Sequence, residues 1–186
     1  MLDNIWNNES LIKTLQKGGI VVMPTDTLYG IVGKAENKET VEHIYELRKR
    51  SPDKPCIILI ANVSELDQFG IIPTEEQKKE IENYKESTSF VVDCSEEKFE
   101  YLHRGTKTLA FRIPAPKELQ NLLKQTGSLI APSANIEGEP PAKNILEAQK
   151  YFGNTVDLYI DGGETTGKAS KVIKLHKDGS IDILRN

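Results

Sequence analysis

Two short polar segments directly follow apolar runs that have the length of buried strands. Residues 20–23 (Ile-Val-Val-Met) lead into residues 24–30, and residues 129–131 (Leu-Ile-Ala) lead into Ser133 and Asn135. The first segment offers two hydroxyls, a carboxylate and a phenol, and the second offers a hydroxyl and an amide that could bind a nucleotide. In open α/β sheets, ligands bind at the carboxyl ends of the strands. Both segments are therefore candidate ligand sites, with an Asx or Ser/Thr turn as the alternative interpretation of the first.

A cluster of cations lies between these two segments in the chain. Arg48, Lys49, Arg50 and Lys54 occupy four of seven consecutive positions, and two prolines keep this loop extended. Such a compact cluster is favourable when it binds polyanions or phosphates, whose oxygens accept hydrogen bonds from arginine. A solvated run of charges is the alternative interpretation of the same pattern.

The sequence gives no support to nucleophilic catalysis. The histidines His43, His103 and His176 are predicted in a helix, a polar loop and a strand end, without an Asp or Ser partner at an informative spacing. Ser133 lies in Pro-Ser-Ala-Asn and not in the Gly-x-Ser-x-Gly elbow of many hydrolases. A hydrolase with a catalytic triad is therefore not indicated.

Residues 162–169 (Gly-Gly-Glu-Thr-Thr-Gly-Lys-Ala) match part of the P-loop pattern. Ala169 stands where a P-loop needs Ser or Thr for magnesium. The following residues 172–175 predict a strand, whereas a P-loop needs a helix N-terminus to hold phosphate. The pattern therefore favours a glycine-rich turn between strands.

Composition limits the location and the partners of the protein. At 186 residues with 38% hydrophobic side chains, the chain is long enough for one compact domain. A net charge of -4 argues against a surface that binds nucleic acid everywhere. Without a signal peptide or a membrane span, a soluble cytoplasmic protein is expected. Cys56 and Cys94 lack the spacing of a zinc site and are predicted to be buried hydrophobes, so no metal site is predicted.

Predicted helices and strands alternate along the chain. Helices are expected near residues 9–17, 41–48, 119–123 and 145–152, and a capping box from Thr74 to Gln77 begins another. Strands are expected at residues 20–23, 57–60, 90–92, 109–113, 129–131, 158–160, 172–175 and 181–184. This alternation predicts a single α/β domain over residues 1–186. The turn signal Asp178-Gly179 predicts a final hairpin, so the sheet should be mixed.

Taken in order, the polar segments resemble the motifs of the YrdC family. Its members show Pro-Thr-(Asp/Glu)-Thr-x-Tyr-Gly after a strand, then Lys-x-Arg, then Arg-Ile-Pro at a strand end, then Ser-x-Asn. The corresponding positions here are residues 24–30, 48–50, 112–114 and 133–135, followed by Gly162, Gly163, Gly167, Ser170 and residues 183–185. The ordered set is specific, and it covers nearly the whole chain.

The resemblance implies a twisted open α/β sheet with helices on its faces and a concave ligand-binding surface. It also implies the activity of an L-threonylcarbamoyl-AMP synthase, which condenses ATP, L-threonine and bicarbonate or carbon dioxide with release of pyrophosphate. Mg²⁺ is implied together with ATP. The implied partner is the tRNA threonylcarbamoyl-transferase machinery, which forms threonylcarbamoyladenosine.

The family motifs also imply roles for single residues. Arg48 and Arg50 are the expected catalytic residues, because such a reaction needs positioning and positive charge at the phosphates but no protein nucleophile. The expected ATP-binding residues are Arg48, Arg50, Arg112, Ser133, Asn135 and Arg185. The expected threonine-binding residues are Thr25, Thr27, Tyr29, Thr108 and Ser170.

Three departures from the family pattern leave two alternatives open. Arg48 replaces the first Lys of Lys-x-Arg, residues 84–89 (Tyr-Lys-Glu-Ser-Thr-Ser) replace Trp-Pro-Gly-Pro-Leu-Thr, and residues 169–171 (Ala-Ser-Lys) replace Glu-Ser-Thr. One alternative is a YciO-like paralogue that kept the fold without the synthase reaction. The other is an RNA-binding module that uses the cations of residues 48–54. An aromatic content of 6% argues against base stacking in such a module.

Overall fold

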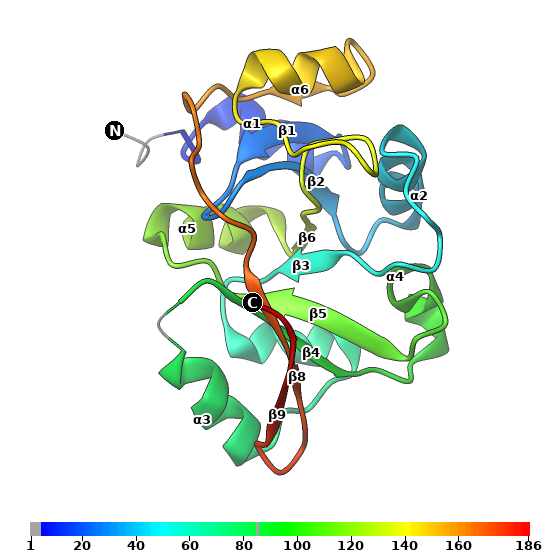
Figure 1. The fold of residues 1–186 in the computed structure, drawn as a ribbon, viewed down its shortest axis with the longest axis vertical. Helices are drawn as coiled ribbons and strands as arrows, with labels where there is room; N and C mark the ends of the chain where they lie inside the picture. Colours follow the sequence, from blue (N-terminus) through cyan, green and yellow to red (C-terminus); the bar gives the residue numbers. More distant parts are fainter. Residues whose placement is uncertain (1–4, 85) are drawn as a thin grey trace.

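The computed structural model describes residues 5–84 and 86–186. Within these residues, nine strands form one sheet in the order β7-β1-β2-β6-β3-β5-β4-β8-β9 (Figure 1). Parallel pairs are β1 with β7, β3 with β5 and β4 with β8, and the other neighbours are antiparallel. The predicted α/β class with a mixed sheet is confirmed. The strands are β1 Val21–Pro24, β2 Tyr29–Lys34, β3 Ile57–Leu59, β4 Thr88–Asp93, β5 Thr108–Arg112, β6 Leu129–Ile130, β7 Leu158–Tyr159, β8 Lys171–Leu175 and β9 Ile181–Arg185.

Polar caps fix where several helices begin. The side chains of Asn8, Asn37 and Asn144 each accept a hydrogen bond from a backbone N–H of the first turn. The predicted capping box forms between Thr74 and Gln77, each side chain accepting from the other residue's backbone. The helical elements are α1 Glu9–Gln16, α2 Lys38–Leu47, η1 Val63–Phe69, α3 Glu75–Asn83, η2 Glu97–Phe99, α4 Glu100–His103, α5 Lys117–Thr126 and α6 Ile145–Phe152.

Helices cover the sheet on both faces and form two apolar layers. In one layer, α1 and α5 pack on β1 and β6, and Trp6 joins this core. In the other layer, α2, α4, α6 and η1 pack on the opposite faces of β1, β3, β4, β5 and β8. Burying each large apolar side chain contributes roughly 1.5–3 kcal/mol, so these layers hold the sheet that carries the polar loops.

Strand alternation leaves part of one sheet face free for a ligand. In β5, Leu109 and Phe111 belong to the apolar core, whereas Thr108, Ala110 and Arg112 point to the opposite face. The neighbouring strands β3 and β4 continue this face, because their residues are paired in register with β5. One strand therefore supplies both core packing and site residues.

The structure corrects two predictions and leaves some residues undescribed. A strand over residues 29–34 was not predicted, but Tyr29 begins β2 and pairs with Pro24, so that residues 25–28 form the loop of a hairpin. His103 was expected in a polar loop, but it is the buried last residue of α4, which ends where Arg104 adopts a left-handed conformation. Residues 1–4 and Lys85 of the divergent segment 84–89 lie outside the described residues.

Two other expectations concern residues 162–169 and the two cysteines. Residues 162–169 contain no helix and lead into β8, as predicted against a P-loop, but they form an extended connection rather than the expected turn. Cys56 and Cys94 are buried free thiols, as predicted. Among the residues that the structure describes, no helix is long and apolar enough to cross a bilayer.

Candidate functional site

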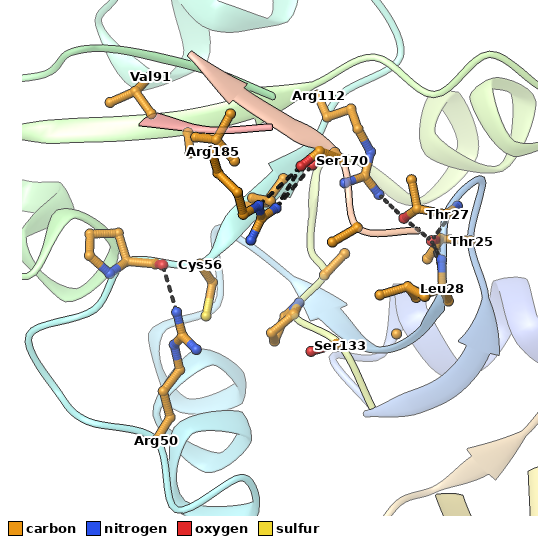
Figure 2. Close-up of a pocket in the computed structure, with 18 of the residues that line it drawn as sticks. Thr25, Thr27, Leu28, Arg50, Cys56, Val91, Arg112, Ser133, Ser170 and Arg185 are labelled. Carbon is orange, nitrogen blue, oxygen red and sulfur yellow. Dashed lines mark hydrogen bonds between the residues drawn. The ribbon is translucent and has the colours of Figure 1, made fainter. Parts of the chain in front are cut away.

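A cleft of about 410 Å³ lies on the free face of the sheet, at the ends of the strands that precede the polar segments. Ten of the eleven residues predicted from the sequence line it, although they come from distant parts of the chain (Figure 2). These residues are Thr25, Thr27, Tyr29, Arg48, Arg50, Thr108, Arg112, Ser133, Ser170 and Arg185. Asn135 does not line the cleft.

The floor of the cleft is apolar and was not anticipated from the sequence. Ile57, Val91 and Ala110 stand side by side on β3, β4 and β5, and Val172 and Leu184 extend the floor onto β8 and β9. Strand alternation is the signal for the centre of this floor, because Val91 and Ala110 each lie between two core residues of their strand. An apolar floor with polar groups at its rim is the usual composition of a small-molecule site.

Arg112 forms a buried ion pair that was not predicted from the sequence. Its Nη2 donates to Asp26 Oδ1 at 2.9 Å and to Thr27 Oγ1 at 3.3 Å, and the exposed fractions of the Arg112 and Asp26 side chains are 4% and 3%. The pair therefore joins the β1–β2 loop to the end of β5. It fixes the direction of a guanidinium that lines the cleft.

Arg48 is also buried, and Asn135 holds it in place. Arg48 Nε donates to the Asn135 carbonyl at 3.1 Å, and Nη2 donates to Asn135 Oδ1 at 3.0 Å and to Ser133 Oγ at 3.3 Å. The Asn135 amide nitrogen donates in turn to the carbonyls of Ile136 and Glu139. Burial, and secondly the charge of Arg50, lowers the pKa of the Arg48 guanidinium. Asn135 thus affects the cleft indirectly, because it orients the Arg48 side chain that lines it.

Two other cations of residues 48–54, Arg50 and Lys54, are engaged by the protein itself. Arg50 Nε and Nη2 donate to the carbonyls of Lys54 and Pro55, both at 3.0 Å, so the side chain is held against the cleft (Figure 2). Lys54 pairs with Glu137 at 2.7 Å. This loop is therefore a folded rim of the cleft rather than a free run of charges.

Residues 161–170, here called the strap, cross the site. They connect β7 at one edge of the sheet with β8 near the other edge (Figure 1). The Tyr29 hydroxyl donates to the Gly163 carbonyl at 2.8 Å and accepts from the Gly162 N–H at 2.9 Å. A Cβ at Gly167 would lie 1.8 Å from the Thr27 carbonyl oxygen. The strap is thus anchored on the β1–β2 hairpin, and burial raises the pKa of the Tyr29 phenol, which keeps it neutral.

The C-terminal end of the strap meets Arg185 of β9. Arg185 Nε and Nη2 donate to the Ser170 carbonyl at 3.1 and 2.8 Å (Figure 2). The hydroxyls of Ser170 and Ser89 are 2.8 Å apart. Burial, and secondly the nearby charge of Arg112, lowers the pKa of Arg185. Two guanidiniums that repel each other across a cleft favour an anion between them.

The threonines of the site combine turn formation with exposure to the cleft. Thr25 Oγ1 donates to the Leu28 carbonyl at 2.8 Å and accepts from the backbone N–H of Thr27, which is a Ser/Thr turn. Both interpretations of residues 24–30 therefore hold, because the same threonines line the cleft. Thr108 contacts the Thr106 hydroxyl at 3.0 Å. No group of three or more His, Cys, Asp or Glu residues in the described part of the chain could hold a metal ion.

The fold and the cleft define an α/β protein with an arginine-lined cleft on the free face of a mixed sheet. A family model named Sua5_yciO_yrdC, described as telomere recombination, matches residues 13–186. The chain belongs to this family. The resemblance seen in the sequence motifs is confirmed.

Several curated relatives share the name threonylcarbamoyl-AMP synthase. The Pyrococcus abyssi protein is 32% identical over 91% of this chain, and the Bacillus subtilis protein is 30% identical over 88%. This chain spans about half of those two relatives, 51% and 49% of their lengths. The Pseudomonas fluorescens Pf0-1 protein is 25% identical over 96% of this chain, which spans 97% of that relative.

Solved structures of relatives have the same fold. Pyrococcus abyssi Sua5 in complex with L-threonine superposes with a TM-score of 0.81 at 29% identity, over 94% of this chain and 52% of that one. Escherichia coli YciO gives a TM-score of 0.82 at 24% identity, over 100% of this chain and 90% of that one. The second similarity concerns the fold alone.

Proposed function

We propose that this protein is an L-threonylcarbamoyl-AMP synthase, a nucleotidyltransferase that converts ATP, L-threonine and bicarbonate or carbon dioxide into threonylcarbamoyl-AMP and pyrophosphate. The observation that carries the proposal is the convergence of Arg48, Arg50, Arg112 and Arg185 on one cleft with an apolar floor. The names of the relatives and the threonine complex of Pyrococcus abyssi Sua5 support the choice of substrates. The product would serve the tRNA threonylcarbamoyl-transferase machinery.

The proposed reaction needs no nucleophile from the protein. The threonine amine attacks carbon dioxide and loses a proton to give a carbamate; when bicarbonate is the source, one of its oxygens leaves as water. A carbamate oxygen then attacks the α-phosphorus of ATP, so that pyrophosphate leaves with the electrons of the broken P–O bond. The protein must hold the reactants, exclude water from the labile carbamate and stabilise charge on the phosphate oxygens. Mg²⁺ would enter with ATP as part of the substrate.

The arginines of the cleft differ in how the protein balances their charge. Asp26 balances Arg112, whereas Arg185 donates only to the neutral groups of Ser170, so the cleft keeps an excess of positive charge. A polyphosphate would relieve the repulsion between the two guanidiniums. Arginine forks also bind phosphate oxygens in a bidentate manner. We therefore assign Arg48, Arg50, Arg112 and Arg185, here called the arginine wall, to ATP.

The remaining polar residues are assigned to threonine and to positioning. Thr25, Thr27, Tyr29, Thr108 and Ser170 would line the threonine pocket. The Tyr29 hydroxyl is already bonded to the strap, so its role would be to shape the pocket. Ser133 would contact the nucleotide, and Asn135 would act through Arg48.

Mass spectrometry tests the proposed function directly. Purified protein given ATP, Mg²⁺, bicarbonate and L-threonine is expected to form threonylcarbamoyl-AMP and release pyrophosphate, only when threonine and bicarbonate are both present. ATP binding without product would favour the YciO-like paralogue. RNA binding with steep salt dependence and no ATP affinity would favour the RNA-binding module.

The variant Asn135→Ala tests the role of the residue that does not reach the cleft. Removing Oδ1 frees Arg48 Nη2 and Ser133 Oγ, so we expect ATP affinity, measured by titration calorimetry, to fall about tenfold. Asn144→Ala is the matched control, because Asn144 caps α6 away from the cleft. Unchanged ATP affinity in Asn135→Ala would contradict this role.

A further inference from the structure

Residues 86–89, here called the buttress segment, lead into β4 beside the arginine wall. They belong to the part of the chain that departs from the family motif. The segment is fixed by β8, because the Lys171 N–H donates to the Ser87 carbonyl at 3.0 Å. Neither Ser87 nor Ser89 lines the cleft, so neither is placed to touch a ligand there.

The two serines of the buttress segment bond to residues that hold different arginines. Ser87 Oγ donates to Asp26 Oδ2 at 3.3 Å, and the other oxygen of Asp26 accepts from Arg112. Ser89 Oγ lies 2.8 Å from Ser170 Oγ, and Ser170 accepts from Arg185. Each arginine thus stands at the end of a chain of contacts that begins in one short segment.

The hydrogen-bonded hydroxyls of Ser89 and Ser170, in the second of these chains, are both buried. Ser89 is 0% exposed and Ser170 is 3% exposed, so neither hydroxyl can replace its partner with water at little cost. Thr88, which lies between the two serines, points to the opposite face of β4. Its hydroxyl is buried without a hydrogen-bond partner among the described residues. The hydroxyls that have partners are therefore those on the cleft side.

We propose that Ser87 and Ser89 are positioning residues that orient Arg112 and Arg185 toward the anionic part of the substrate. The inference deepens the proposed function and rests on it, because it assumes that the arginine wall binds ATP. The physical reason is that reactants must be held closely, and a displacement of about 1 Å can cost on the order of 100-fold in rate. The divergent segment would then supply alignment through side-chain hydroxyls.

A double-mutant cycle separates positioning from a merely structural role. ATP affinity is measured by calorimetry, in the presence of Mg²⁺, for wild-type protein, Ser89→Ala, Arg185→Ala and the double variant. Ser89→Ala is expected to weaken ATP binding about threefold to tenfold. In the Arg185→Ala background the same change should have no further effect, because Ser89 acts through Arg185.

Ser87 gives a second and independent cycle with Arg112. Ser87 is only partly buried, so Ser87→Ala should fold normally, and Ser87→Thr keeps the hydroxyl and should restore affinity. Thr88→Val is the matched control, because it removes a hydroxyl without a partner from the same segment and should leave ATP affinity unchanged.

The outcomes distinguish the two proposals. Wild-type protein that binds neither ATP nor threonine would contradict the proposed function. Wild-type protein that binds ATP, with additive effects in both cycles or with an equal loss in Thr88→Val, would contradict only the positioning role.

Discussion

Replacing Arg112 by alanine is expected to lower synthase turnover by about 100-fold or more and the free energy of unfolding by about 3–5 kcal/mol. Turnover falls because the cleft loses a guanidinium at the proposed phosphate site. Stability falls because Asp26, whose side chain is 3% exposed, keeps its charge without the partner at 2.9 Å. Product formation by mass spectrometry and urea denaturation measure the two effects.

The two effects can be separated by a second substitution. Asp26→Asn in the Arg112→Ala background removes the unpaired buried charge, so most of the lost stability should return. Turnover should remain low, because the guanidinium is still missing. A stable single variant, or a double variant that regains turnover, would contradict the assignment of Arg112 to both roles.

Much of the site could be predicted because the polar residues follow the ends of strands. Thr108 and Arg112 illustrate this, since alternation along β5 puts them on the face opposite to Leu109 and Phe111. The motifs gave the order of the segments along the chain. Ten predicted residues from these segments line one cleft.

The missed strand β2 has a local physical explanation. Its sequence contains Gly30 and Gly33, which lower strand propensity, and no strand was predicted there. Gly33 lies under α2, where a Cβ would come within 2.4 Å of Thr40 Cγ2. Close packing of α2 on β2 therefore requires glycine at position 33, and this glycine weakens the strand pattern in the sequence.

Pairings between distant residues could not be predicted either. Asp26 and Arg112 are 86 positions apart, and Arg48 and Asn135 are 87 apart. A motif indicates that a polar residue is near a site, but only the sheet order decides which partner it meets. This is why Asp26 was noted without being assigned a role and why Asn135 was expected to contact ATP directly.

The substitution Gly167→Ala should have the second large effect, because it separates the strap from the hairpin beneath it. The added Cβ would lie 1.8 Å from the Thr27 carbonyl oxygen and 2.9 Å from its carbon, and both are backbone atoms that cannot rotate away. The strap would have to lift, which moves Ser170 and, through it, Arg185. We expect ATP and threonine affinities to fall by about tenfold to 100-fold and stability to fall by about 1–3 kcal/mol.

Gly163→Ala is the control that isolates this steric overlap from the general loss of a glycine. Gly163 lies in the same strap at a φ of 78°, but nothing stands within 4 Å of an added Cβ. Its cost is therefore conformational, about 1–2 kcal/mol, with the strap still seated and both affinities close to wild type. Calorimetric titration of both variants with ATP and with threonine measures whether the loss of affinity is specific to Gly167→Ala. Equal affinities in the two variants would show that contact between Gly167 and Thr27 does not shape the site, whereas a selective loss in Gly167→Ala would show that the seated strap forms a wall that the ligands need.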